Sequence, residues 1–193
     1  MTQKEQTKEN LVEAFWTLYK DKPLEKITVK EITDKAGYNR GTFYSYFKDT
    51  YEMQKYVRDS LLPDEHFILE PFKGIEDGTA KVFNRMEWAG EYFENNHDKI
   101  AVLFGPSGDP AFIHEFKVRV RNIIMGYLKD INVKDLEAIE LMLEFHISAL
   151  IGLFQLWVEK DKQISRAKLE TIIEQISQEG IISAMEEKLA ERK

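Results

Sequence analysis

Apolar residues recur at helical spacing along most of the chain, and no segment shows the strict alternation that is typical of a β-strand. The first apolar stripe predicts an amphipathic helix over residues 7–19, and its members are Leu11, Ala14, Phe15 and Leu18. Further helices are predicted over residues 82–93, 100–104, 110–130 and 133–160, after Ser165 up to an interruption at Gly180, and over 181–189. The pattern therefore predicts an all-α protein.

Residues 28–47 have the pattern of two short helices joined by a tight turn. Thr28 and Glu31 have the spacing of a capping box at the start of the first helix. Gly37 follows this helix, at a point where the chain must adopt a left-handed conformation that a residue with a Cβ resists. The segment therefore predicts a helix, a forced turn and a second helix.

The second helix of this pair has an inward and an outward face. Asn39 is placed to cap it. Phe43 and Phe47 fall on the inward face. The outward residues offer donors and aromatic rings to a DNA groove, and they are Arg40, Thr42, Tyr44 and Ser45. This arrangement is typical of a helix-turn-helix that binds DNA.

A domain boundary is predicted where proline and glycine become frequent. Asp49 and Glu52 predict the N-cap of a helix that ends before Pro63, and further prolines and glycines follow up to residue 78. We therefore assign residues 1–62 to a DNA-binding domain of the helix-turn-helix type. Residues 63–193 are assigned to a second, all-helical domain.

The longest predicted helix is apolar around more than half of its circumference. One side carries Leu136, Ile139, Leu143, Ile147, Leu150, Phe154 and Trp157. The other side carries Met142, Phe145, Ala149, Leu153 and Leu156. A helix with two apolar sides needs two partners, so we expect it to form a four-helix dimer interface with the last helix and their symmetry mates. The alternative is that both sides fill the core of a monomer.

The 193-residue chain has a net charge of −7 and no cysteine, which excludes disulfides, thiol catalysis and cysteine-ligated zinc. Its first residues are polar and charged, unlike a signal peptide. The most apolar segment contains Glu144 and His146, and its longest run without a formal charge, residues 145–158, is shorter than the ~20 residues that span a membrane. We therefore expect a soluble, cytoplasmic protein.

The charge is unevenly distributed along the chain. Residues 1–60 hold 11 basic and 10 acidic residues, whereas the remainder holds 16 basic and 24 acidic residues. Within residues 26–58 the balance is 7 basic against 4 acidic residues. This modest excess is compatible with contact to DNA phosphates but does not establish it.

Neither metal binding nor catalysis is indicated by the motifs. The four histidines lack the spacing of metal ligands, and they are His66, His97, His114 and His146. A glycine-rich phosphate loop and a Gly-x-Ser-x-Gly motif are also lacking. We therefore expect no enzyme, no metal and no cofactor.

A ligand pocket in a helical bundle is mainly apolar and carries few polar groups. The candidate residues for binding a ligand, such as an effector, are Trp88, Phe104, Phe116, Met142, Phe145 and His146. Most of them are equally compatible with an ordinary core. Glu144 and His146 are polar groups in the most apolar helix, so at least one of them is expected to face a cavity, a water or a ligand.

The segment from about residue 10 to residue 58 resembles the TetR family of bacterial transcriptional regulators. The resemblance rests on Thr28, Glu31, Ile32, Ala36, Gly37, Gly41, Thr42, Phe43, Tyr44 and Phe47. It implies contacts to base edges from Tyr38, Asn39, Arg40 and Gly41. It implies contacts to DNA phosphates from Thr42, Tyr44, Tyr46 and Lys48. Lys30 could contact a base edge or a phosphate. The chain departs from the family at Thr50, where lysine is common.

The resemblance implies a homodimeric transcriptional regulator, a repressor that a small-molecule effector releases from a near-palindromic double-stranded DNA operator. It also implies that residues 63–193 form the helical regulatory domain, which binds the effector and dimerises. One alternative is a co-regulator that acts by protein contact and has lost operator binding, which Thr50 and the weak basic charge favour. Another is a helical small-molecule carrier or enzyme. The sequence does not identify the effector, the operator, the target genes or the sign of regulation.

Overall fold

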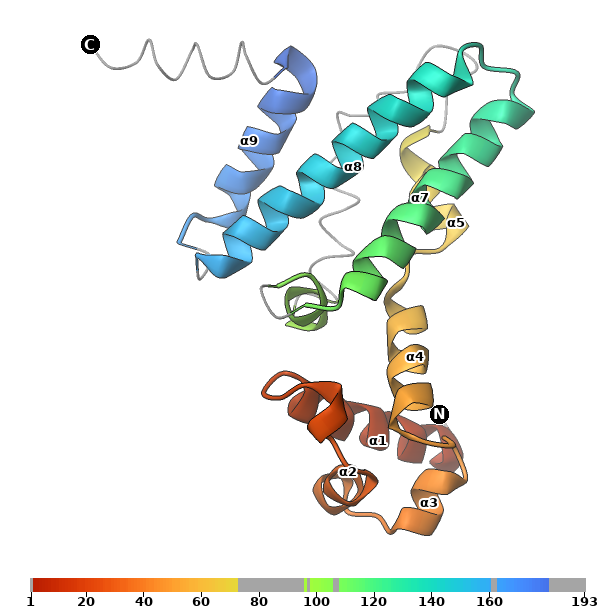
Figure 1. The fold of residues 1–193 in the computed structure, drawn as a ribbon, viewed down its shortest axis with the longest axis vertical. Helices are drawn as coiled ribbons and strands as arrows, with labels where there is room; N and C mark the ends of the chain where they lie inside the picture. Colours follow the sequence, from red (N-terminus) through yellow and green to blue (C-terminus); the bar gives the residue numbers. More distant parts are fainter. Residues whose placement is uncertain (1, 73–95, 97, 106–107, 161–162, 181–193) are drawn as a thin grey trace. The chain divides into compact units, whose positions relative to one another are not determined.

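The computed structural model describes residues 2–72, 96, 98–105, 108–160 and 163–180. Every regular element in these ranges is a helix, which confirms the predicted all-α class (Figure 1). The helices predicted over residues 82–93 and 181–189 lie outside the described residues. The chain divides into two compact units, Met1–Leu62 and Pro63–Lys193, and each is described by itself.

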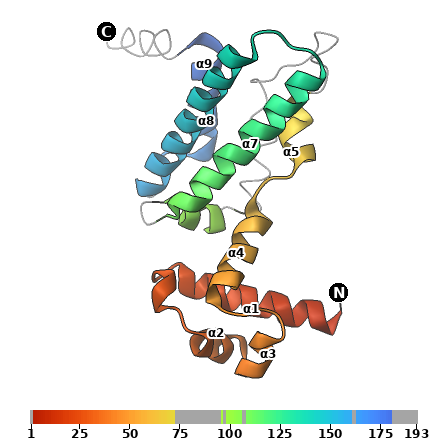
Figure 2. The ribbon, with the colours of Figure 1, turned by 45° about the vertical axis from the view of Figure 1, so that its right-hand side comes forward.

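The first unit is a small helical domain built around one aromatic core. Its elements are α1 (Gln3–Tyr19), η1 (Leu24–Lys26), α2 (Val29–Ala36), α3 (Arg40–Tyr44) and α4 (Thr50–Leu61) (Figure 2). Its most buried side chains are Leu11, Phe15, Trp16, Ile32, Phe43, Met53 and Val57. Residues from α1 to α4 contribute to this core, so α1 supports the pair formed by α2 and α3.

Helix α1 begins four residues earlier than its apolar stripe predicts. Thr2 accepts a hydrogen bond from the backbone NH of Glu5, and the Glu5 carboxylate accepts one from the backbone NH of Thr2. This capping box stabilises a polar first turn, which the position of the apolar residues alone does not reveal.

The second unit contains two long helices that lie side by side in both ribbon views, α7 (Pro110–Asp130) and α8 (Leu136–Glu159). Its other described elements are α5 (Glu65–Leu69), η2 (Glu70–Phe72), a helical stretch at 98–104, and α9 (Arg166–Glu179). The predicted cap of α7 is confirmed, since Asp109 accepts from the amides of Ala111 and Phe112 and Pro110 occupies the first turn.

Helix α8 starts three residues later than predicted because Asp135, at φ 56°, caps it through the amide of Ala138. The predicted start of the last helix is confirmed by Ser165, whose hydroxyl accepts from the amide of Lys168. Both starts depend on a hydrogen bond between residues three apart, which is a local interaction.

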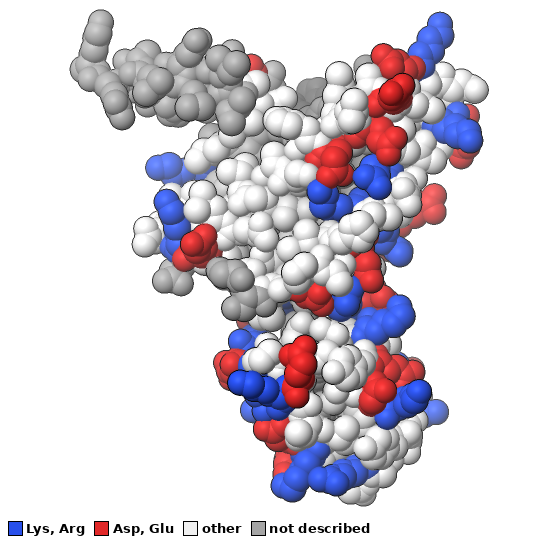
Figure 3. All heavy atoms as spheres, viewed as in Figure 1, with Lys and Arg blue, Asp and Glu red and all other residues white. Residues whose placement is uncertain are grey.

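Helix α8 presents one apolar side to its own chain and another to the surface. Leu143, Ile147, Ile151 and Trp157 are buried. The opposite side is exposed, with Leu141, Met142, Phe145, Ala149, Gly152 and Leu156. Figure 3 shows this region as a largely uncharged surface over the middle of α8. We call these six residues the α8 face.

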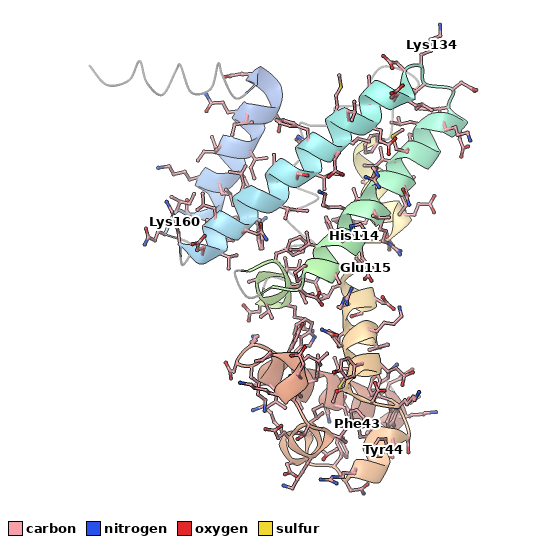
Figure 4. All side chains as sticks on the ribbon, viewed as in Figure 1. Phe43, Tyr44, His114, Glu115, Lys134 and Lys160 are labelled. Carbon is pink, nitrogen blue, oxygen red and sulfur yellow. The ribbon has the colours of Figure 1, made fainter. Side chains whose placement is uncertain are left out.

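By length and hydropathy α8 is the one helix among the described residues that could cross a membrane. Lys134 and Lys160 lie at its two ends (Figure 4). The core helix of a soluble protein has the same length and hydropathy, and one side of α8 packs within its own chain. The opposite side of α8 is exposed to solvent.

Candidate nucleic-acid interface

The capping box predicted at the start of α2 is present. The amide of Glu31 donates to Thr28 Oγ1 over 3.3 Å, and the amide of Thr28 donates to Glu31 Oε2 over 3.0 Å. Glu31 Oε1 also lies 2.5 Å from the ammonium group of Lys22. Hydrogen bonds from Lys22 and Thr28 lower the pKa of Glu31 from 4.5 to about 2. The charged form of Glu31 is therefore the one that the fold favours.

Because the folded pKa of Glu31 lies below its unfolded value, its contribution to stability is present above about pH 4.5 and is lost as the pH falls toward 2. We expect Glu31→Gln to flatten the acid limb of the stability curve, since glutamine preserves the cap but carries no charge. Urea unfolding between about pH 5 and pH 2 measures this. Glu13→Gln, at an exposed site on α1, is the control, and an unchanged acid limb in Glu31→Gln would contradict the assignment.

The turn between α2 and α3 depends on Gly37, which adopts φ 76° as the sequence predicts. Residues with a Cβ rarely adopt a positive φ, so any substitution of Gly37 strains the backbone. The amide of Tyr38 donates to the carbonyl of Thr33 over 2.9 Å, which closes the turn onto α2. The glycine therefore fixes the direction in which α3 leaves α2.

Asn39 caps α3, as predicted. Its Oδ1 accepts from the amide of Thr42 over 2.9 Å and from the Thr42 hydroxyl over 3.3 Å. A Cβ at Gly41 would lie 3.1 Å from the same oxygen, so a glycine fits best beside this cap. Because the cap occupies Oδ1, the amide nitrogen of Asn39 is the group that remains to contact a base.

The predicted inward and outward faces of α3 are confirmed for the aromatic residues. Phe43 and Phe47 are buried, whereas Tyr44 is 58% exposed and meets the Phe43 ring edge-on at 5.6 Å (Figure 4). Arg40 and Lys48 are also exposed. Arg40, Tyr44 and Lys48 thus present two cationic groups and a phenol along one short exposed segment of the first unit.

Some predicted contact residues already have partners within the chain. The ammonium group of Lys30 lies 2.6 Å from Asp34, and both side chains are exposed, so a contact from Lys30 to DNA requires exchange of this partner. Thr42 uses its hydroxyl on Asn39, and Tyr46 is half-buried. Thr50, the departure from the family pattern, is the first residue of α4 after the Asp49 cap.

The candidate effector residues do not form one group. Trp88 lies outside the described residues. The ring centroids of Phe104 and Phe116 are 5.3 Å apart in an aromatic cluster that also contains Phe112 and Phe154. Phe104 and Phe112 are buried, and Phe116 and Phe154 are half-buried. In contrast, Met142 and Phe145 are 67% and 72% exposed on the α8 face. An exposed side chain cannot line the interior of a single chain, so the structure favours an interface role for these two residues.

Glu144 and His146 differ in their surroundings. The carboxylate of Glu144 pairs with Lys117, lies 3.3 Å from Arg121 and accepts from the Ser148 hydroxyl over 3.2 Å. These contacts, led by the hydrogen bond from Lys117, lower the pKa of Glu144. Oppositely charged side chains meet in this part of α7 and α8 in Figure 3. Glu144 thus has two cationic partners on α7 and one hydroxyl partner on α8, all within its own chain.

His146 is half-buried on α8, and burial lowers its pKa. A lowered pKa favours neutral imidazole, which offers one donor and one acceptor. No group of three or more metal-binding side chains is found in the described part of the chain.

Two family models match the chain. Residues 11–57 match the model of bacterial regulatory proteins of the tetR family, and residues 82–179 match the model of a transcriptional regulator C-terminal region. The two matches cover the helix-turn-helix unit and most of the second unit. No curated protein matches the chain.

Three solved structures are similar over nearly the whole chain. A TetR transcriptional regulator from Streptococcus agalactiae 2603V is 21% identical, with TM-score 0.57 and coverage of 90% of this chain and 94% of that chain. A tetR-family regulator from Streptomyces coelicolor is 20% identical, with TM-score 0.59 and coverage of 98% and 90%. The dihydroxyacetone kinase operon activator DhaS is 17% identical, with TM-score 0.56 and coverage of 93% and 96%. At these identities the likeness shows the fold.

Proposed function

Since the chain belongs to the TetR family of bacterial transcriptional regulators, we propose that it is a cytoplasmic homodimeric repressor that a small molecule releases from its operator. Membership makes the chain a DNA-binding regulator rather than an enzyme. The repressor role, the release by an effector and the residues that carry each step are the parts that we propose.

The proposal that the chain binds an operator rests on the exposed segment around α3. The guanidinium of Arg40 is shaped for bidentate contact with the O6 and N7 of guanine. Tyr44 and Lys48 are suited to phosphate oxygens, which fix the register without specifying sequence. Lys30 joins them if its ammonium group moves from Asp34 to DNA. A domain with a small net charge can bind DNA when its cations are concentrated in this way.

The α8 face supports the homodimer. Its residues Met142, Phe145, Ala149, Gly152 and Leu156 repeat at intervals of three and four, which is the spacing of a helix–helix seam. Exposed apolar patches of this kind mark association surfaces. A second copy of α8 supplies an identical patch, and a two-fold axis pairs the two.

Effector release is proposed to act on the second unit. A ligand that favours one arrangement of the two DNA-binding units shifts the population toward it, and release follows when their spacing no longer matches successive major grooves. We assign the ligand contacts to Phe104, Phe116 and His146, because the aromatic cluster is apolar and His146 adds one polar group. Trp88 stays a candidate on the basis of the sequence alone.

We expect His146→Ala to raise the effector concentration for half-release at least about 5-fold, the worth of one hydrogen bond. The measurement uses a compound selected because it releases the wild-type protein from DNA. His114→Ala, at an exposed site on α7, is the control (Figure 4). An unchanged response in His146→Ala would place the effector site elsewhere.

The sign of regulation needs its own test, because one similar structure is named an operon activator. We expect a reporter under the chain's own upstream DNA to be expressed more strongly when the gene of this protein is deleted. Lower expression after deletion would make the protein an activator.

Operator binding is tested with short duplexes tiled across the DNA upstream of the chain's own gene. We expect at least one duplex to bind with an affinity that falls steeply as the salt concentration rises. Absence of salt-dependent binding to every duplex would contradict the proposal and favour action through protein contact.

A further inference from the structure

A hydrogen bond connects α1 to the turn in front of the recognition helix. The Nδ2 group of Asn10 donates to the hydroxyl oxygen of Tyr38 over 3.0 Å, and both side chains are half-buried. Tyr38 directly precedes Asn39, the cap of α3. Asn10 therefore contacts the segment that carries the proposed base contacts, although α1 itself lies outside the helix-turn-helix.

Gln6 contacts the other end of the Asn10 amide. Its Nε2 donates to Asn10 Oδ1 over 3.0 Å. Because that oxygen faces Gln6, the amide nitrogen faces Tyr38, and the Tyr38 hydroxyl is the acceptor in the bond between them. A phenol has one hydrogen to donate, and among the described residues the Tyr38 hydroxyl takes part in this bond as the acceptor. Its hydrogen can therefore donate to an acceptor other than Asn10.

We propose that Asn10 is a positioning residue of the DNA interface. It holds the Tyr38 ring in place and leaves the hydroxyl hydrogen to donate to an acceptor atom of the operator. A hydroxyl that already accepts one hydrogen bond is polarised and donates more strongly. The inference rests on the proposed function, because it requires that the segment around α3 contact DNA.

The test uses a duplex that the wild-type protein selects from a randomised pool, together with an unrelated duplex. We expect Asn10→Ala and Tyr38→Phe each to weaken binding to the selected duplex at least about 5-fold. The double variant should bind no more weakly than Tyr38→Phe, because Asn10 acts through the Tyr38 hydroxyl. An equal loss on both duplexes identifies a phosphate acceptor, and a loss confined to the selected duplex identifies a base edge.

The chain contains a matched control bond. Gln54 Nε2 donates to the Tyr19 hydroxyl over 2.9 Å, which joins α4 to the end of α1 away from the recognition segment. Gln54→Ala and Tyr19→Phe should lower the Tm about as much as the test variants do and leave the affinity for DNA unchanged. A merely structural role for Asn10 would instead give the two pairs the same effects on Tm and on affinity.

The outcomes separate this inference from the proposed function. Wild-type binding to neither duplex would overturn both. Normal wild-type binding, with Asn10→Ala unchanged or with additive losses in the double variant, would overturn the positioning role alone.

Discussion

Replacement of Arg40 by alanine should weaken operator binding by about 1–3 kcal/mol and relax the preference at one position of each half-site. The physical reason is that the guanidinium makes its two parallel hydrogen bonds only with guanine. Arg40 is exposed in the first turn of α3, so truncation of its side chain exposes no buried residue. Affinities for a panel of operator variants, each with one base pair changed, measure the loss of discrimination.

Lys48→Ala should behave differently from Arg40→Ala. We expect it to weaken binding to all duplexes and to reduce the slope of log affinity against log salt by about one for each protomer, since it removes one phosphate contact. Lys129→Ala removes an equal charge from the end of α7 and should leave the slope unchanged. If Arg40→Ala lowers affinity for every sequence equally, its assignment to a base edge is wrong.

The second large effect is expected at the α8 face. A Cβ at Gly152 would meet nothing within 4 Å, so a side chain at this exposed position begins in open space and we expect leucine to leave the fold intact. In a close helix pair the same leucine collides with the partner. We therefore expect Gly152→Leu to weaken the dimer by about 2 kcal/mol or more, roughly 30-fold in dissociation constant, without lowering the intrinsic stability of the chain.

Gly126→Leu on α7 is the matched control, because a Cβ there also meets nothing within 4 Å. Phe145→Asp, which places a charge at the most exposed large apolar side chain of α8, should dissociate the dimer as well. Sedimentation equilibrium from about 0.1 to 50 µM measures all three, as this range detects dimers with a micromolar Kd and resolves a roughly 30-fold change in it. A wild-type monomer throughout, or a fully dimeric Gly152→Leu variant, would contradict the interface.

Local hydrogen bonds made much of the first unit predictable. The caps at Thr28, Asn39 and Asp49 each join residues three apart, and Gly37 imposes a single turn, so a short stretch of sequence contains the whole interaction. The start of α1 follows the same rule at Thr2 and Glu5. Its Thr-x-x-Glu spacing was present in the sequence, whereas the apolar stripe begins later.

Contacts between distant residues were not predictable in this way. Asn10 and Tyr38 are 28 residues apart, and Arg121 and Glu144 are 23 apart, so no spacing rule brings either pair together. The two apolar sides of α8 were visible in the sequence, but only packing against α7 shows which side is buried. For that reason Met142 and Phe145 were equally compatible with a pocket and with an interface.

Hydroxyl-radical footprinting of the wild-type protein on its upstream DNA tests the central claim most directly. A dimer that places two copies of α3 in successive major grooves should protect two related half-sites, with centres about 10 bp or a multiple of that apart on one face of the duplex. Arg40→Ala should weaken the protection of both half-sites to the same extent. A single unpaired site, or no protected site at all, would contradict the account.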